Sequence, residues 1–79
     1  MSADYRILIV DDEPDLTDLY ASWFPDEYAV ETAYDGRSAI EALDSSVDVV
    51  LLDRRMPGMS GDEVLQWIRD QRLGCGVAM

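Results

Sequence analysis

Two short runs of apolar residues stand out along the chain, and each ends at an aspartate. The first run precedes Asp11 and the second precedes Asp53. Runs of this length, rich in β-branched residues and closed by polar ones, are typical of strands buried in a parallel sheet. Asp35 and Gly36 indicate a turn after a shorter, less apolar segment. Four strands are predicted, at residues 5–10, 28–33, 47–52 and, as the opening of a strand, 76–79.

Helical spacing of apolar residues fills the segments between these strands. The positions are Leu16, Leu19, Tyr20 and Trp23, then Ala39, Ile40 and Leu43, then Val64, Leu65, Trp67 and Ile68. Pro14 suits the first turn of the first helix, and Pro25 ends it. Ser60 and Glu63 form a capping-box pattern at the start of the third helix, and Gly74 is a good terminator. We expect both tryptophans to lie in the core or to be half-buried against it.

The order of elements predicts an α/β fold. Strands alternate with helices as βαβαβα plus the start of a fourth strand, which indicates a parallel sheet with helices on both faces. We expect a flavodoxin-like, doubly wound sheet with strand order 2-1-3-4. Residues 1–79 form one partial domain in this interpretation, because no linker or repeat interrupts the pattern.

Acidic residues gather where the two central strands end. Parallel sheets bind ligands beyond the carboxyl ends of their strands, at the point where the strand order reverses. Asp11, Asp12 and Asp53 should therefore meet at one edge of the sheet. Three carboxylates in one cleft repel one another, and a hard divalent cation with oxygen ligands, such as Mg²⁺, would relieve the repulsion. An aspartate beside Mg²⁺ can also accept a phosphoryl group.

The composition is strongly acidic, and this excludes some partners. The net charge is −11, from 17 acidic residues against six arginines, with no lysine and no histidine. Such a surface repels nucleic acid and anionic membranes, so we expect direct contact with neither. Two explanations stay open: a surface that favours solubility, or adaptation to high salt. One cysteine, no signal peptide and no long apolar run predict a cytoplasmic location.

The ordered motifs resemble a response-regulator receiver domain. They are IVDDEP at 9–14, DG at 35–36 and LLDRRMPGMSG at 51–61, and together they span essentially the whole chain. The arginine pair after Asp53 and the following DEVL at 62–65 are similar to haloarchaeal HalX-type receivers. The resemblance implies a signalling domain of a two-component phosphorelay rather than an enzyme in the usual sense.

The resemblance also implies roles for individual residues. Asp53 is the phospho-acceptor, Asp12 is a direct Mg²⁺ ligand, and Asp11 helps to hold the ion. Arg55 supplies its backbone carbonyl to the metal, and Pro57 with Gly58 shapes the adjacent loop. The phosphoryl donor in this family is a phosphohistidine on a sensor histidine kinase, which is the partner we expect.

The chain also departs from the family pattern. A complete receiver carries a serine or threonine just after its fourth strand and a lysine at the end of its fifth, and both bind the phosphoryl group. The present sequence contains no lysine and ends at Met79, before either position. We therefore expect a truncated product or a fragment, able to self-associate through an exposed sheet edge. A truncated or degenerate receiver that only binds other proteins is the alternative function.

Rival classes fit the residues less well. A phosphatase of the haloacid dehalogenase type needs an Asp-x-Asp at a strand end, where this chain has a lone Asp53. An EF-hand starting at Asp11 would place Leu16 where glycine is required. An all-helical carrier protein would not contain two buried-strand runs.

Overall fold

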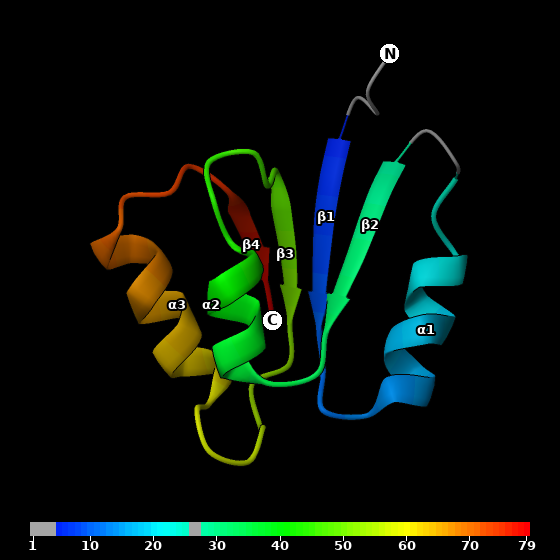
Figure 1. Ribbon diagram of the computed structural model, residues 1–79, viewed down its shortest axis with the longest axis horizontal. Helices are drawn as coiled ribbons and strands as arrows, with labels where there is room; N and C mark the ends of the chain where they lie inside the picture. Colours follow the sequence, from blue (N-terminus) through cyan, green and yellow to red (C-terminus); the bar gives the residue numbers. More distant parts are fainter. Residues whose placement is uncertain (1–4, 26–27) are drawn as a thin grey trace.

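The computed structural model describes residues 5–25 and 28–79. Four parallel strands form one sheet, with α1 on one side and α2 and α3 on the other (Figure 1). The elements in chain order are β1 (Tyr5–Val10), α1 (Pro14–Ser22), β2 (Tyr28–Ala33), α2 (Gly36–Ala42), β3 (Val49–Leu52), α3 (Gly61–Asp70) and β4 (Gly76–Ala78). The predicted α/β architecture is confirmed.

The strand order is β2-β1-β3-β4, as the sequence predicts. The central strand β1 pairs with β2 on one side and β3 on the other, in parallel. Val10 lies opposite Ala33 in β2 and Leu52 in β3, so all three strands end at the same level. The residues that follow β1 and β3 therefore emerge side by side.

One face of the sheet carries most of the core. Leu8 and Val10 of β1 alternate with residues of the opposite face, and Val50 and Leu52 do the same in β3. These side chains pack against Val64 and other residues of α2 and α3. Burial of each large apolar side chain contributes about 1.5–3 kcal/mol. The strands and two of the helices are thus fixed by one layer of contacts.

Helix α1 differs from the sequence prediction in which residues it buries. Its buried residue is Thr17, whereas Leu19 is 46% exposed and Trp23 is 66% exposed. Trp23 was expected to be at least half-buried, and that prediction is wrong. The helix ends at Ser22, before Trp23, whose ring packs on Tyr20 with 5.1 Å between centroids. Trp67 does pack, partly buried, against the core from α3.

Two element boundaries also differ from the sequence prediction, and one predicted turn residue has a further role. Strand β3 begins at Val49, because the Val47 N–H donates to the Asp44 carbonyl in a turn. Asp35 is not only a turn residue, since it caps α2 by accepting a hydrogen bond from the Ser38 N–H at 2.7 Å. Helix α3 ends before Gly74, in a Schellman turn with Arg72 at φ 56°.

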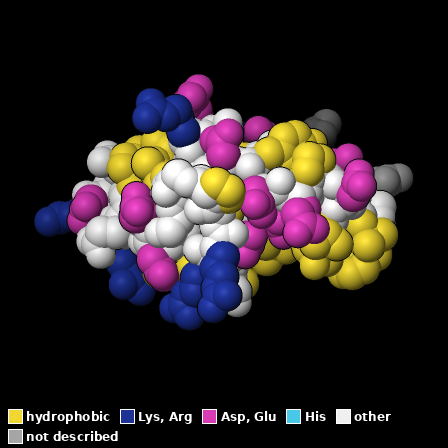
Figure 2. All heavy atoms as spheres, turned by 90° about the horizontal axis from the view of Figure 1, so that it is seen from below, with side chains coloured by type: hydrophobic (Ala, Val, Ile, Leu, Met, Phe, Trp, Pro, Cys, Tyr) yellow, Lys and Arg dark blue, Asp and Glu magenta, His cyan; other side chains and the backbone are white. Residues whose placement is uncertain are grey.

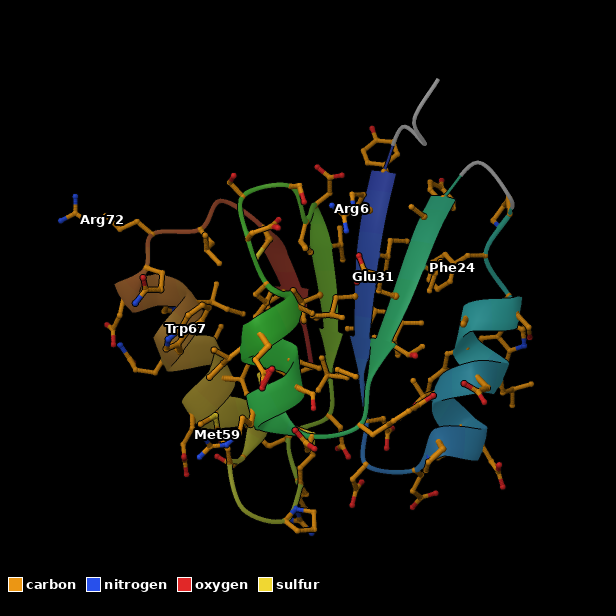
Figure 3. The ribbon with its side chains drawn as sticks, viewed as in Figure 1. Arg6, Phe24, Glu31, Met59, Trp67 and Arg72 are labelled. Carbon is orange, nitrogen blue, oxygen red and sulfur yellow. The ribbon has the colours of Figure 1, made fainter. Side chains whose placement is uncertain are left out.

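That turn at the end of α3 has both of its defining hydrogen bonds. The Leu73 N–H donates to the Ile68 carbonyl at 3.2 Å, and the Arg72 N–H donates to the Arg69 carbonyl at 3.0 Å. The left-handed position is usually taken by glycine. Here it is taken by Arg72, whose side chain points away from the molecule (Figure 3).

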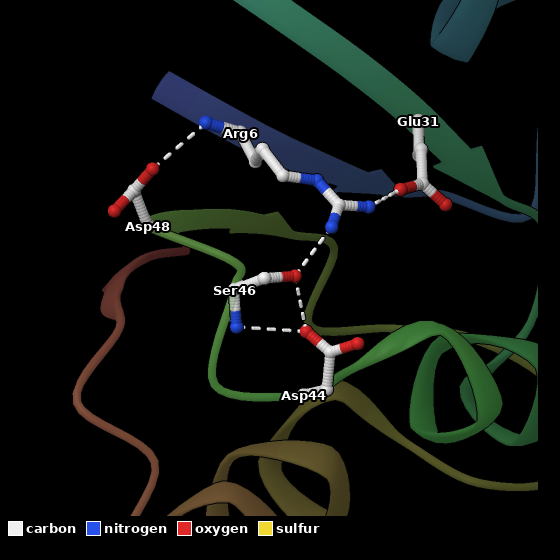
Figure 4. Close-up of polar contacts among 5 residues, drawn as sticks. All are labelled: Arg6, Glu31, Asp44, Ser46 and Asp48. Carbon is white, nitrogen blue, oxygen red and sulfur yellow. Dashed lines mark hydrogen bonds and ion pairs between the residues drawn. The ribbon is translucent and has the colours of Figure 1, made fainter. Parts of the chain in front are cut away.

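A polar network joins the strands at the sheet's opposite end, where β1 begins (Figure 4). The Arg6 guanidinium donates to Glu31 on β2 and to the Ser46 hydroxyl, and the backbone N–H of Arg6 donates to Asp48 Oδ2 at 2.8 Å. Hydrogen bonds from the Ser46 hydroxyl and N–H lower the pKa of Asp44. The network secures the N-terminal ends of the strands, far from the clustered aspartates.

Cys75 lies between α3 and β4 and is half-buried against the core. Loss of hydration on burial raises the pKa of its thiol. The side chain therefore remains an uncharged packing residue at neutral pH, close to the small apolar role that the sequence predicts.

Candidate functional site

Three aspartates meet at the carboxyl ends of β1 and β3. Asp11 and Asp12 directly follow β1, and Asp53 directly follows β3. One carboxylate oxygen from each lies within 4.8 Å of the others. Asp11 and Asp53 are half-buried and Asp12 is exposed. The structure thus brings together the side chains that the sequence places at this edge, and their chemical roles remain predictions.

Backbone hydrogen bonds continue the sheet past the strand ends and fix these residues. The Asp53 N–H donates to the Val10 carbonyl at 2.9 Å. The Asp11 N–H donates to the Ala33 carbonyl at 3.1 Å. Because both aspartates are still held in the ladder, their Cα positions are set by the sheet rather than by a loose loop.

Each of the two half-buried carboxylates is also oriented by a backbone donor two residues later. The Glu13 N–H donates to Asp11 Oδ1 at 3.0 Å, and the Arg55 N–H donates to Asp53 Oδ1 at 3.2 Å. Such local turns are a common use of aspartate after a strand. They hold Oδ1 of each residue in place while the carboxylates face the common cleft.

Thr17 holds the turn between β1 and α1, and sequence reasoning missed it. The side chain is fully buried, and its hydroxyl lies 2.9 Å from the Glu13 carbonyl and 3.3 Å from the Asp11 carbonyl. Both acceptors belong to the segment that carries Asp11 and Asp12. The available signal was a threonine one turn into an otherwise acidic helix, where its hydroxyl can reach back to the preceding turn.

Two glycines allow the loops around the cleft to pack closely, and their role was also missed. A Cβ on Gly61 would lie 2.3 Å from the Asp53 carbonyl oxygen and 2.8 Å from the Arg54 Cα. A Cβ on Gly36 would lie 2.8 Å from the Cβ of Met59. Met59 sits beside α2 at the bottom of the molecule (Figure 3). The loop after Asp53 is therefore pressed against both the strand end and α2.

The same loop contains the arginine pair. Both arginines are exposed, and the Arg54 Nε lies 3.4 Å from Asp62 Oδ1 in a surface ion pair. Arg55 contributes its N–H to Asp53, and the use of its carbonyl by a metal remains a prediction. Gly58 adopts φ 77°, a left-handed conformation that suits the loop which Pro57 and Gly58 are expected to shape.

The chemistry of the cleft follows from its charge and its donors. Figure 2 looks onto this end of the sheet and shows acidic side chains gathered near the middle of the face. An all-oxygen set of carboxylates with one exposed member suits a hard cation that keeps several of its waters. Mg²⁺ fits this set better than a softer metal, which would favour sulfur or imidazole ligands.

Comparison with known proteins agrees with this arrangement. The sequence profile of the response regulator receiver domain matches residues 7–79. A Haloferax volcanii protein bearing a transcriptional-regulator name is 53% identical over 79 residues, which is 99% of this chain and 14% of that protein. No helix in the described part of the chain is long and apolar enough to cross a membrane.

Solved structures show the same fold. The response regulator TrrA from Thermotoga maritima, in complex with Mg²⁺-BeF, superposes with a TM-score of 0.81 at 36% identity. The complex of the histidine kinase ThkA with TrrA gives a TM-score of 0.78. In both, the match covers 92% of this chain and 65% of TrrA. The chain thus spans about two thirds of that regulator and about one seventh of the Haloferax protein.

Proposed function

This chain belongs to the response regulator receiver domain family, and from that premise we propose that Asp53 accepts a phosphoryl group with the help of Mg²⁺. The observation that carries the proposal is the approach of the Asp11, Asp12 and Asp53 carboxylates to within 4.8 Å of one another. Receivers are signalling domains of two-component systems, so the transferred group serves as a signal rather than as a step in metabolism.

Each residue of the site has its own proposed role in phosphoryl transfer. Asp12 and Asp53 would bind the cation directly, Asp11 would help to hold it, and the Arg55 carbonyl would complete the protein ligands. When bound, Mg²⁺ neutralises the charge of the carboxylates and of the incoming phosphoryl group. Asp53 Oδ1 is held by the Arg55 N–H, so we assign the attack to Oδ2.

The transfer step requires only the phosphohistidine donor and a proton from solvent. Oδ2 of Asp53 forms a bond to phosphorus as the bond between phosphorus and the donor's imidazole nitrogen breaks. The electron pair of that bond stays on the imidazole, which takes a proton from solvent. Asp53 becomes an acyl phosphate. The backbone hydrogen bonds described above hold the Asp11 and Asp53 carboxylates in position before the transfer begins.

The donor we expect is a phosphohistidine on a sensor histidine kinase. TrrA, whose fold this chain shares, has been solved in complex with the histidine kinase ThkA. The net charge of −11 disfavours direct contact of this segment with nucleic acid or an anionic membrane, and a cytoplasmic location fits such a partner.

The alternative is a receiver that binds partners without taking up phosphate. The given stretch of 79 residues contains no lysine, so by itself it supplies no ammonium group to the phosphoryl site. The lysine that other receivers use would stabilise charge on the phosphoryl group. We therefore expect phosphorylation of this chain alone to be slower than that of a version extended through a fifth strand.

Acetyl phosphate, a small acyl phosphate donor, tests the proposal. The chain is incubated with the donor and Mg²⁺, and intact mass spectrometry measures the phosphorylated fraction over time. Asp53→Asn should abolish labelling, EDTA should suppress it, and Asp62→Asn, an exposed acidic site outside the cluster, should leave it unchanged. Labelling that persists in Asp53→Asn would refute the assignment, and no labelling even in the extended version would favour the binding-only alternative.

A further inference from the structure

The turn between β1 and α1 carries two of the three clustered aspartates. Asp11, Asp12 and Glu13 are the residues that separate the end of β1 from the start of α1 (Figure 1). Glu13 stands at the N-cap of α1, and within the described chain its side chain makes no cap hydrogen bond. Pro14 follows at the first helical position and has no N–H to donate. This turn therefore relies on contacts other than the side-chain cap that usually fastens the start of a helix.

Thr17 supplies such a contact from the interior. It is the one polar side chain that is buried among the described residues. Its hydroxyl lies 2.9 Å from the Glu13 carbonyl oxygen and 3.3 Å from the Asp11 carbonyl oxygen, and these two acceptors share its single proton. Burial of a hydroxyl costs free energy unless it is hydrogen-bonded, and a valine of the same shape would avoid that cost. Packing alone therefore does not require a threonine here.

The two acceptors differ in how much they depend on the hydroxyl. The Glu13 carbonyl also accepts the Thr17 N–H at 3.0 Å, as the first hydrogen bond of α1. That bond remains when the hydroxyl is removed. The Asp11 carbonyl belongs to the peptide group that joins Asp11 to Asp12, so the Thr17 hydroxyl restrains the orientation of that peptide. The direction in which the Asp12 carboxylate leaves the turn depends on the same peptide.

We propose that Thr17 is a positioning residue for the Mg²⁺ site, because its hydroxyl holds the peptide between Asp11 and Asp12 in the orientation that brings their carboxylates toward Asp53. Thr17 acts on the same cation as the phospho-acceptor, so this role rests on the function proposed above. Mg²⁺ demands a nearly ideal octahedral arrangement of oxygen ligands. Groups that orient metal ligands without touching the metal contribute about 10- to 100-fold to metal affinity.

Two substitutions separate the hydroxyl of Thr17 from the packing of its side chain. Thr17→Val keeps the shape and removes the hydroxyl, whereas Thr17→Ser keeps the hydroxyl and removes a buried methyl group. A Mg²⁺ titration in high salt, followed by NMR at the Glu13 and Arg55 amides, measures affinity, and thermal scans measure stability. We expect Thr17→Val to bind Mg²⁺ about tenfold more weakly than the wild type. Thr17→Ser should keep the wild-type affinity although the lost methyl group lowers its thermal midpoint.

A matched control and a measurement without metal complete the test. Thr32→Val makes the same change in the other threonine of the sequence, whose hydroxyl lies 3.5 Å from that of Tyr34, and it should leave Mg²⁺ affinity unchanged. In EDTA, amide hydrogen exchange at Glu13 should be faster in Thr17→Val than in the wild type. The reason is that the Glu13 N–H donates to Asp11 Oδ1, and this bond depends on the orientation of the turn.

The outcomes separate this role from the proposed function. Mg²⁺ binding of wild-type strength in Thr17→Val would overturn the positioning role and leave the phospho-acceptor proposal standing. An affinity that falls as far in Thr17→Ser as in Thr17→Val would assign the side chain to packing instead. Unchanged exchange at Glu13 in Thr17→Val would also overturn the role. No saturable Mg²⁺ binding by the wild type would overturn the proposed function and the role of Thr17 together.

Discussion

At the residue scale, the position of Asp53 depends on a neighbour that has no side chain. Gly61 opens α3 and donates its N–H to the Arg54 carbonyl at 3.0 Å. This bond folds the loop back onto the end of β3 and leaves no space for a Cβ. The close approach fixes the backbone on which the proposed phospho-acceptor stands.

Gly61→Ala should therefore destabilise the chain by about 1–3 kcal/mol, the usual cost of forcing extra atoms into a packed site. Alanine favours helix formation more than glycine does, so a loss of stability would isolate the steric contact with the Asp53 carbonyl. Chemical denaturation measures the free energy of unfolding. Gly74→Ala is the control, because a Cβ there meets nothing within 4 Å. Equal stability of the two variants would contradict the close-approach explanation.

Arg72 presents the opposite case, a side chain where glycine would fit better. It occupies the left-handed position of the turn that ends α3, at φ 56°. A left-handed conformation costs an L-residue about 1–2 kcal/mol. Arg72→Gly should raise the free energy of unfolding by up to about 1 kcal/mol, because glycine's larger loss of chain entropy offsets part of the gain. A drop in stability, measured by the same denaturation, would show that the Arg72 side chain contributes more than its backbone costs.

At the element scale, α2 depends on its cap. Asp35 accepts hydrogen bonds from the Ser38 N–H, which has the larger effect, and from the Ser38 hydroxyl. Both lower the pKa of Asp35 in the folded chain. A carboxyl whose pKa is lower when folded stabilises the fold above its unfolded pKa. The contribution is lost as the pH falls through the folded value.

Asp35→Ala should lower the thermal midpoint at neutral pH, because the alanine side chain cannot accept the Ser38 N–H bond. The difference in thermal midpoint between the wild type and this variant should shrink as the pH falls below the ordinary range of aspartate pKa values. Asp35→Asn, which caps without titrating, should keep its advantage over alanine throughout. Thermal scans followed by circular dichroism give the midpoints, and a gap that is constant with pH would count against the cap as the cause.

The strands buried on both faces could be predicted from sequence, whereas for α1 the sequence predicted the helix but not which of its residues are buried. The runs ending at Asp11 and Asp53 are apolar because β1 and β3 are central strands, so their type, order and meeting point followed directly. Helix α1 lies over β1 and β2 and exposes part of its apolar pattern. Periodicity shows which residues share a face, and it cannot show whether a partner covers that face, so Trp23 was misplaced.

Some residues of the proposed site could also be predicted from sequence, and others could not. The aspartates could be found because acidic residues after buried strands are conspicuous in sequence. Thr17 and Gly61 act through a buried hydroxyl and a missing Cβ, and their effect depends on distances between segments far apart in the chain. No local pattern encodes those distances, so the residues that hold the aspartates emerge only from the three-dimensional structure.

At the scale of the whole molecule, the charge of −11 acts on stability. The two ion pairs of the described residues, Arg6 with Glu31 and Arg54 with Asp62, leave most acidic side chains without a basic partner. Their mutual repulsion is screened as ionic strength rises. A chain adapted to high salt would depend on this screening, whereas a surface that serves solubility would not require it.

The thermal midpoint should therefore climb from low to molar KCl. A double variant with Glu41→Gln and Asp70→Asn removes two exposed negative charges that lie away from the helix N-termini, and it should show a smaller climb, with a higher midpoint at low salt. Differential scanning calorimetry across a KCl series makes the comparison. A flat or falling midpoint in the wild type would remove the case for adaptation to high salt.

The most direct test of the central claim is a Mg²⁺ titration followed by NMR at the amides of Glu13 and Arg55, which donate to Asp11 and Asp53. We predict saturable shifts at both amides in the wild type, about tenfold weaker binding in Asp53→Asn because a charged ligand is lost, and wild-type binding in Asp62→Asn. The titration is run in high salt to keep the chain folded. Equal Mg²⁺ affinity in the wild type and Asp53→Asn would contradict a shared site for Asp11, Asp12 and Asp53.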